Sequence, residues 1–209
     1  MEQNDASEKQ RRAIERLERM DDLGPSEKAA ILCVMASMRP ALFMTQEHAP
    51  KHDRDGTFHE EIDRISKVAR SLGLAVEVVR DPTPVTWEEE RHEIEYFYTD
   101  INIAKDEEAL RALMAAHALH GQDEVAWDRA MGSALGYPAT AIQAYEQKNF
   151  LRPDDIPEEI RDRPLMKFVP FSLSPDHWRE ELETVRPWAE AVKRLSPRIY
   201  AEVIHQEKH

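Results

Sequence analysis

The sequence contains very little cysteine and fewer basic than acidic residues. Cys33 is the only cysteine among 209 residues, so it can form neither an intramolecular disulfide nor a paired-cysteine metal site. Lys and Arg number 28 against 41 Asp and Glu, which gives a formal net charge of −13. Because binding phosphates requires clustered positive charge, this balance argues against a broad surface for nucleic acid or anionic membranes. We therefore expect no nucleic-acid partner.

Long apolar runs and the common nucleotide motifs are also missing. No apolar run approaches the roughly 20 residues that span a bilayer, and residues 1–5 are polar and lack signal-peptide character. The sequence has no dinucleotide fingerprint, no Walker loop and no G-x-S-x-G nucleophile elbow. These absences predict a cytoplasmic protein with no membrane partner, and they argue against the nucleotide-driven enzyme classes.

The remaining composition is that of a globular protein. Hydrophobic residues make up 41% and charged residues 33% of the chain, and 209 residues suffice for one domain with a sizeable core. We predict a single domain over residues 1–209. Its parts are a charged N-terminal helix in 1–24, an α/β core over 40–118, a helical insertion and linker over 119–165, and a last strand with C-terminal helices over 166–209.

Hydrophobic periodicity and the positions of Gly and Pro predict the individual elements. The predicted helices span residues 7–22, 27–38, 58–72, 106–118, 124–135 and 139–147, followed by a long helix from 174 that Pro187 kinks or splits near residue 186, and a last helix over 196–206. The predicted strands span 41–45, 74–79, 93–99 and 165–171. The third has an alternative end at Ile103, and the last lies at a sheet edge because Pro170 lacks an N–H donor. Residues 85–91 are predicted to be a charged connection and residues 149–165 an irregular linker.

The order of these elements predicts the fold class. Strand, helix, strand, strand, helix and a later strand is the order of a split β-α-β, ferredoxin-like antiparallel sheet. The chain is therefore predicted to be α+β, with additional helices at both termini and a helical insertion around the LGYP turn. The helix over 29–38 is apolar nearly all round, which predicts burial in the core or in a homodimer interface. Cys33 lies in this helix and is expected to be a buried, inert thiol.

The most distinctive local signature covers residues 132–145 and predicts a helix, a stop, a turn and a second helix. Gly136 suits the left-handed position that ends a helix, and Pro138 suits the first turn of the next one. A tight helix–helix corner with Tyr137 packed on apolar neighbours is one interpretation. The alternative is a ligand site that uses backbone N–H groups of the second helix and the Thr140 hydroxyl. The ligand-binding candidates are Gly136, Tyr137 and Thr140.

The loop over residues 47–61 is the strongest candidate for metal chemistry. It carries three histidines and five carboxylates, and these groups together suit zinc, manganese or iron. The metal-ligand candidates are His48, His52, Asp53, Asp55, His59 and Glu60. Their spacing matches no defined ligand pattern, so a solvated loop with incidental histidines is the competing interpretation.

Several motifs resemble those of the domain-of-unknown-function family numbered 483, which is common in archaea. The resemblance covers about residues 40–205 and is carried by the strand over 95–99, the LGYP turn over 135–138 with Tyr145, and the segments 168–175 and 196–200. It implies the α+β architecture and no activity. Many members place cysteines after the LGYP turn and around the last strand. Because this chain has Ala139, Thr140 and Ala141 at the first place, and Ser172, Ser174 and His177 at the second, cysteine chemistry is not implied for it.

These observations favour a binding or protein-interaction domain. This interpretation is supported by the acidic composition, the lack of a complete catalytic constellation and the apolar second helix. The expected partner is another protein or a second copy of the chain. The alternative is a metal-dependent hydrolase in which His48, His52 and His59 gather a divalent ion that activates water. No cofactor other than this metal is evident, and the sequence leaves open whether the protein is an enzyme.

Overall fold

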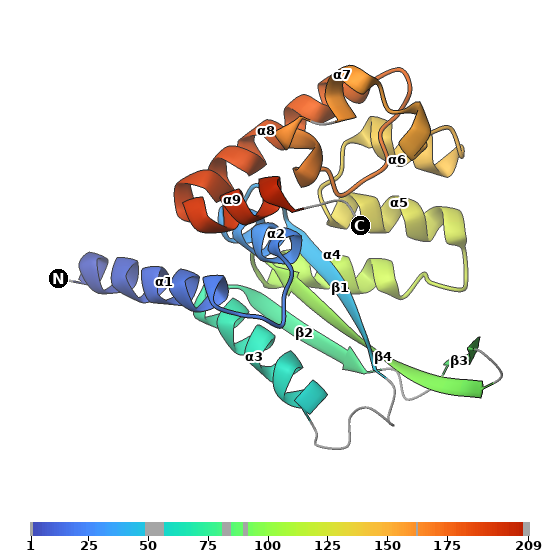
Figure 1. Ribbon diagram of the computed structural model, residues 1–209. Coiled ribbons are helices and arrows are strands. Elements are labelled where there is room, and N and C mark those ends of the chain that lie inside the picture. The colour runs from blue at the N-terminus through green and yellow to red at the C-terminus, as the bar shows by residue number, and fades with distance from the viewer. Residues whose placement is uncertain (1, 49–56, 81–84, 90–91, 162, 207–209) are drawn as a thin grey trace.

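The computed structural model describes residues 2–48, 57–80, 85–89, 92–161 and 163–206, and Figure 1 shows how their elements are arranged. The first half contains α1 (Glu2–Glu18), α2 (Pro25–Met35), β1 (Ala41–His48), α3 (Thr57–Ser71), β2 (Ala75–Arg80), β3 (Val85–Glu89) and β4 (His92–Ala104). The second half contains α4 (Glu107–His117), α5 (Glu124–Ala134), α6 (Ala139–Glu146), the 3-10 helix η1 (Pro153–Asp155), α7 (Glu158–Arg161), the 3-10 helix η2 (Pro164–Phe168), α8 (Trp178–Leu195) and α9 (Pro197–His205). The predicted α+β class is confirmed.

β4 is the centre of an antiparallel sheet with the strand order β1-β4-β2. Its second half pairs with both neighbours, so that Ala104 lies opposite Ala41 on one side and opposite Ala75 on the other. Its first half extends beyond these two strands and pairs with β3 (Figure 1). β4 covers His92–Ala104, so of the two predicted extents, 93–99 and 93–103, the longer one agrees with the structure. Its second half is paired on both sides.

The charged segment over residues 85–91 contains a strand and is not the predicted connection. β3 pairs along its whole length with the first half of β4. Val85, Thr86 and Trp87 are β-branched or aromatic, and such side chains favour an extended, pleated backbone even when charged residues follow them. The prediction was wrong because it was based on the charged residues of the segment and not on the strand preference of its β-branched and aromatic residues.

The two faces of the sheet are covered by different helices, because successive side chains of a strand point to opposite faces. The main core joins α1, α2, α3, α8 and α9 to one face through Leu42, Met44, Ile101 and Ile103. A second core joins α4 and α5 to the other face through Ala41, Phe43, Ala75 and Ala104. Consequently α3 and α4 lie on opposite sides of the sheet (Figure 1). Phe43 faces the second core, where the candidate site lies.

α2 lies in the main core, as its apolar composition predicts. Ile31, Leu32 and Val34 are each at most 1% exposed, and all belong to the main hydrophobic cluster. The neighbouring helices α8 and α9 pack against it. Burial within the chain itself therefore accounts for the apolar surface of this helix.

Cys33 is buried in α2, which confirms the predicted buried thiol, and burial raises the pKa of this thiol to about 12. Since the thiolate is the reactive form, Ellman's reagent at pH 8 is expected to leave the folded protein unlabelled. One thiol per chain should react once denaturant is added. Rapid labelling without denaturant would contradict the burial of this helix.

The segment over residues 165–171 forms no edge strand, so this prediction was wrong. η2 covers Pro164–Phe168, and the chain that follows up to α8 is irregular. Proline at the first position of η2 fixes a helical φ, and Pro170 has no N–H to donate to a neighbouring strand. The apolar side chains of this segment instead pack on α8 and α9.

α8 was predicted to kink or split near residue 186; it does not split, because it runs as one helix over Trp178–Leu195 with Pro187 inside it. A proline removes one intrahelical hydrogen bond and costs about 3 kcal/mol in an isolated helix. Val185, Trp188 and Ala189 surround it in sequence and are all buried. Burial of these apolar side chains outweighs the local cost of the proline.

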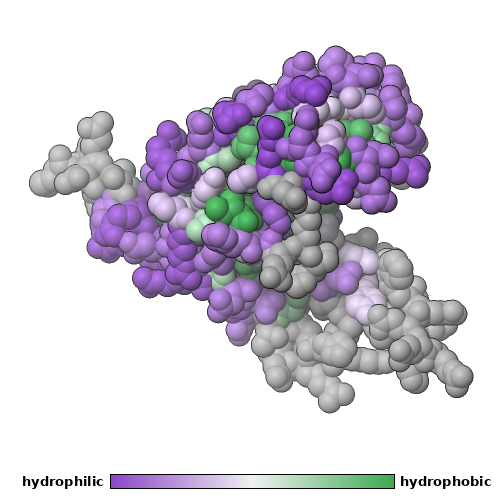
Figure 2. All heavy atoms as spheres, turned by 45° about the horizontal axis from the view of Figure 1, so that its top comes forward, coloured by the Kyte–Doolittle hydropathy of each residue, from purple (hydrophilic) through white to green (hydrophobic). Residues whose placement is uncertain are grey.

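The visible surface agrees with the large share of charged residues in the composition. The face shown in Figure 2 is mostly hydrophilic, with apolar residues showing in small patches between polar ones. Within the ranges that the structure describes, no helix combines the length and the apolar character that crossing a bilayer requires.

Candidate functional site

The LGYP corner between α5 and α6 has the predicted stop and restart. α5 ends at Ala134, and Gly136 follows with φ +75°, in the left-handed region. The Gly136 N–H donates to the Ser133 carbonyl at 3.1 Å, and the Tyr137 N–H donates to the Gly132 carbonyl at 2.9 Å. These two bonds form a Schellman motif, which satisfies carbonyls at the end of α5. α6 begins three residues later at Ala139.

Two glycines let the corner pack closely on its neighbours. A Cβ on Gly136 would lie 2.5 Å from Cδ of Pro40, just before β1. A Cβ on Gly132 would lie 2.7 Å from Cγ1 of Ile142, on α6. Since real Cβ atoms do not approach this closely, both positions require glycine unless their neighbours move. The corner is therefore fixed against the start of β1 and against α6.

Arg39 contacts the corner at Leu135 and Tyr137. Its side chain is almost fully buried, and its Nε donates to the Leu135 carbonyl at 3.3 Å. The guanidinium carbon lies 5.5 Å from the centre of the Tyr137 ring and 5.3 Å from that of Trp188. Burial lowers the pKa of this guanidinium. Cation–π contacts on two rings offset part of the cost of burying the charge.

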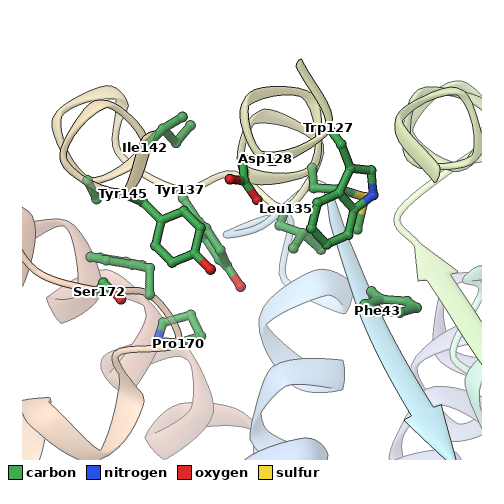
Figure 3. Close-up of a pocket in the computed structure, with 13 residues that line it drawn as sticks. Phe43, Trp127, Asp128, Leu135, Tyr137, Ile142, Tyr145, Pro170 and Ser172 are labelled. Atoms are coloured by element: carbon green, nitrogen blue, oxygen red, sulfur yellow. The ribbon is translucent and has the colours of Figure 1, made fainter. Parts of the chain in front are cut away.

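A cavity of about 250 Å³ lies beside the corner, between α5, α6, β1 and the segment over 170–172 (Figure 3). Five aromatic side chains contribute to its wall, which is mostly apolar. The lining residues are Phe43, Trp127, Asp128, Met131, Gly132, Leu135, Tyr137, Ala141, Ile142, Tyr145, Pro170, Phe171 and Ser172. Because these residues come from distant parts of the sequence, the cavity depends on the complete fold.

Neighbouring rings hold several of the aromatic walls in place. Tyr137 lies against Phe171 with ring centres 5.3 Å apart, and Phe171 meets Trp188 edge-on at 6.3 Å. Tyr145 stacks on Phe150 at 5.5 Å. Such ring pairs each contribute about 0.5–1.5 kcal/mol beyond simple burial. The wall is therefore largely formed before any ligand arrives.

Asp128 supplies the negative charge of the cavity wall. Its side chain is 13% exposed, and Nζ of Lys148 lies 4.0 Å from its Oδ2. The same Nζ lies 5.0 Å from the centre of the Tyr145 ring. In Figure 3 the Asp128 carboxylate descends from α5 into the space between Tyr137 and Trp127. The aromatic cavity thus has one acidic group directed into it.

Polar groups around Phe43 lack hydrogen-bond partners within the described part of the protein. These are both amide atoms of Asn102, Nε2 of His117 and Nε1 of Trp127. The His117 ring lies edge-on to Phe43 with centres 4.5 Å apart, and Asn102 is opposite Phe43 in the β1–β4 register. Burial lowers the pKa of His117, so its ring is neutral at pH 7. Trp127 lines the cavity, whereas Asn102 and His117 lie outside the lining.

Of the three predicted ligand-binding residues, one lines the cavity and two do not. Tyr137 lines the cavity, whereas Gly136 shapes the corner behind it and Thr140 is half-buried outside the lining. The wall consists mainly of side chains rather than of the backbone N–H groups that the sequence suggested. Trp127 and Asp128 escaped sequence reasoning because consecutive residues in the middle of a helix give no signal of a shared cavity.

The metal-ligand candidates are only partly within the described residues. His48 ends β1, and His59 and Glu60 lie in the first turn of α3. His52, Asp53 and Asp55 lie outside the described residues. Over the ranges given above, no three His, Cys, Asp or Glu side chains come together as a metal site would require. The metal site of the 47–61 loop stays a prediction.

Comparisons of the chain with protein-family models, with curated proteins and with solved structures give no match. The resemblance to the family numbered 483 therefore stays a prediction.

Proposed function

We propose that the protein is a binding protein that takes a small aromatic ligand in the cavity beside the LGYP corner. The observation that carries the proposal is the group of aromatic side chains that line one largely apolar cavity: Phe43, Trp127, Tyr137, Tyr145 and Phe171. Ligand pockets are typically concave, apolar and preformed, with few polar groups that orient the ligand. Asp128 and Ser172 are such groups in this lining.

The size of the cavity limits the ligand. Its volume of about 250 Å³ suits a molecule with one ring or two fused rings. For about ten non-hydrogen atoms at about 0.5 kcal/mol each, we expect a Kd on the order of 0.1–1 mM for a simple probe. A natural ligand with added polar contacts would bind more tightly.

Indole is a suitable probe because it is flat, uncharged and small enough for the cavity. Replacing Ser172 with tryptophan adds a large side chain to the lining, on an irregular segment where it disturbs no helix. We expect this variant to bind indole at least tenfold more weakly than the natural chain, measured by ligand-detected NMR titration. Ser133→Trp is the matched control, since Ser133 is exposed and lies outside the lining. Equal loss in both variants, or no loss in Ser172→Trp, would contradict the site.

We include in the proposal that the sheet is built on a split β-α-β unit. α3 and α4 cover opposite faces of the sheet, which departs from the ferredoxin-like arrangement, in which both helices cover one face. β1, α3, β2, β4 and α4 follow one another in the chain with β3 inserted, and β4 lies antiparallel between β1 and β2. This arrangement agrees with a split β-α-β unit. η2 and the irregular segment that helps to line the cavity take the place of the strand predicted over residues 165–171.

A further inference from the structure

We infer that the ligand is an organic cation, a protonated amine or quaternary ammonium group attached to an aromatic ring, with Asp128 as its anionic partner. This inference rests on the proposed function and specifies the chemical class of its ligand. It is carried by the environment of Asp128, by the position of Lys148 and by the charge of the whole chain.

Asp128 is the one residue with a charged side chain in the lining, within the part of the chain that the structure describes. The Asp128 side chain is 13% exposed. Burying a carboxylate to this extent costs free energy of desolvation unless a cation or several hydrogen-bond donors offset it. Its ion pair with Lys148 spans 4.0 Å, which is the outer limit for such a pair. The carboxylate therefore has room for a closer cation on the side that faces the cavity.

Lys148 shows where a cation is favoured. Its side chain is 72% exposed, yet its Nζ lies both 4.0 Å from the Asp128 carboxylate and 5.0 Å from the Tyr145 ring centre. An ammonium group between a carboxylate and an aromatic face is the arrangement that recognises amine ligands. Because Lys148 is long and largely solvated, it holds this position weakly. A bound cation can occupy the inner side of the same carboxylate.

The aromatic wall and the net charge add to this preference. The faces of tryptophan and tyrosine rings attract an ammonium group by about 0.5–2 kcal/mol, depending on its desolvation. Trp127, Tyr137 and Tyr145 provide such rings around Asp128. The net charge of −13 attracts cations to the surface and repels anions.

An anionic ligand fits this lining poorly. No Lys or Arg lines the cavity among the described residues. Arg39 lies outside the lining, where its Nε is bonded to the Leu135 carbonyl and its guanidinium contacts the Tyr137 ring. An anion in the cavity would therefore face the Asp128 carboxylate with no cation in the wall to offset the repulsion.

Three indole derivatives that differ mainly in charge test the inference. Tryptamine is a cation at pH 7, tryptophol is neutral and indole-3-propionate is an anion. By isothermal titration at low salt, tryptamine is expected to bind about tenfold more tightly than tryptophol, and indole-3-propionate more weakly than either. In Asp128→Asn the preference for tryptamine over tryptophol, taken as the ratio of their two Kd values, should fall to about twofold or less.

Lys148→Gln provides a second variant with the opposite effect. It removes the competing ammonium from Asp128 and Tyr145 and leaves the lining intact, so the affinity for tryptamine should rise about two- to fivefold. The affinity for tryptophol should not change. Because Lys148 is exposed, this variant is expected to fold even if Asp128→Asn does not.

The possible outcomes separate the inference from the proposed function. Tryptophol binding as tightly as tryptamine, or a preference for tryptamine that survives Asp128→Asn, overturns the cation inference and leaves the binding site standing. Loss of tryptamine affinity in Lys148→Gln also overturns it, since Lys148 would then assist the cation. Failure of all three compounds and of indole to bind overturns the proposed function itself.

Discussion

Replacing Gly136 with alanine is expected to lower the free energy of unfolding by about 3 kcal/mol. The left-handed backbone at Gly136, with φ +75°, costs a residue that has a Cβ about 1–2 kcal/mol. The added Cβ would also lie 2.5 Å from Cδ of Pro40, and overpacking of this kind costs about 1–3 kcal/mol. Urea unfolding followed by circular dichroism measures the change.

Gly121→Ala is the matched control for this substitution. Gly121 has nearly the same backbone angle, φ +74°, but a Cβ there would meet no atom within 4 Å. Only the backbone cost of about 1–2 kcal/mol should remain. A loss in Gly136→Ala no larger than in Gly121→Ala would show that the corner is not packed tightly on Pro40.

The second large effect is expected at Glu181, whose replacement by alanine should lower the free energy of unfolding by about 2–4 kcal/mol. This side chain is 1% exposed and accepts hydrogen bonds from the N–H and the hydroxyl of Ser174, both at 2.8 Å. Alanine would leave both buried donors without an acceptor, at about 1–3 kcal/mol for each unpaired group, less what relaxation recovers. Thermal and urea unfolding measure the loss.

Glu181 also bears on the candidate site, because Ser174 follows the segment over 170–172 that lines the cavity. Glu181→Ala is therefore expected to weaken indole binding under conditions where the variant is still folded. Glu181→Gln keeps an oxygen acceptor and nearly the same shape, so it should lose less than half as much stability. Equal losses in the two variants would show that the negative charge of Glu181, and not its bonds to Ser174, stabilises this region.

The fold was most predictable where local chemistry and packing agree. Glycine typically ends a helix in the left-handed conformation, and proline typically starts one. Gly136 and Pro138 therefore predicted the corner between α5 and α6 correctly. At Pro187 local chemistry and packing disagree. Proline tends to break a helix, yet burial of the neighbouring side chains keeps α8 continuous. The prediction for β3 was wrong for a related reason. β3 pairs with the first half of β4, and this partner cannot be inferred from the charged sequence of β3 itself.

The candidate site was much less predictable than the fold. Tyr137 was singled out because it belongs to the corner, and it does line the cavity. Phe43 lies about 90 residues from it in sequence, and its place in the wall depends on which face of β1 meets α4. Asp128 looks like an ordinary surface acid of a helix in the sequence, and only the packing of α5 against α6 turns it inward. Such residues become visible only when the elements are placed in space.

The most direct test of the binding site is a tryptophol titration of the 15N,13C-labelled protein followed by NMR. Trp127 and Ile142 line the cavity, whereas Trp178 packs in a separate cluster with Leu173 and Leu182. The account predicts that the indole N–H signal of Trp127 and the δ1 methyl signal of Ile142 shift together and saturate, while the indole N–H signal of Trp178 stays in place. Saturable binding that leaves the signals of Trp127 and Ile142 unchanged would contradict it, because the ligand would then occupy another part of the protein.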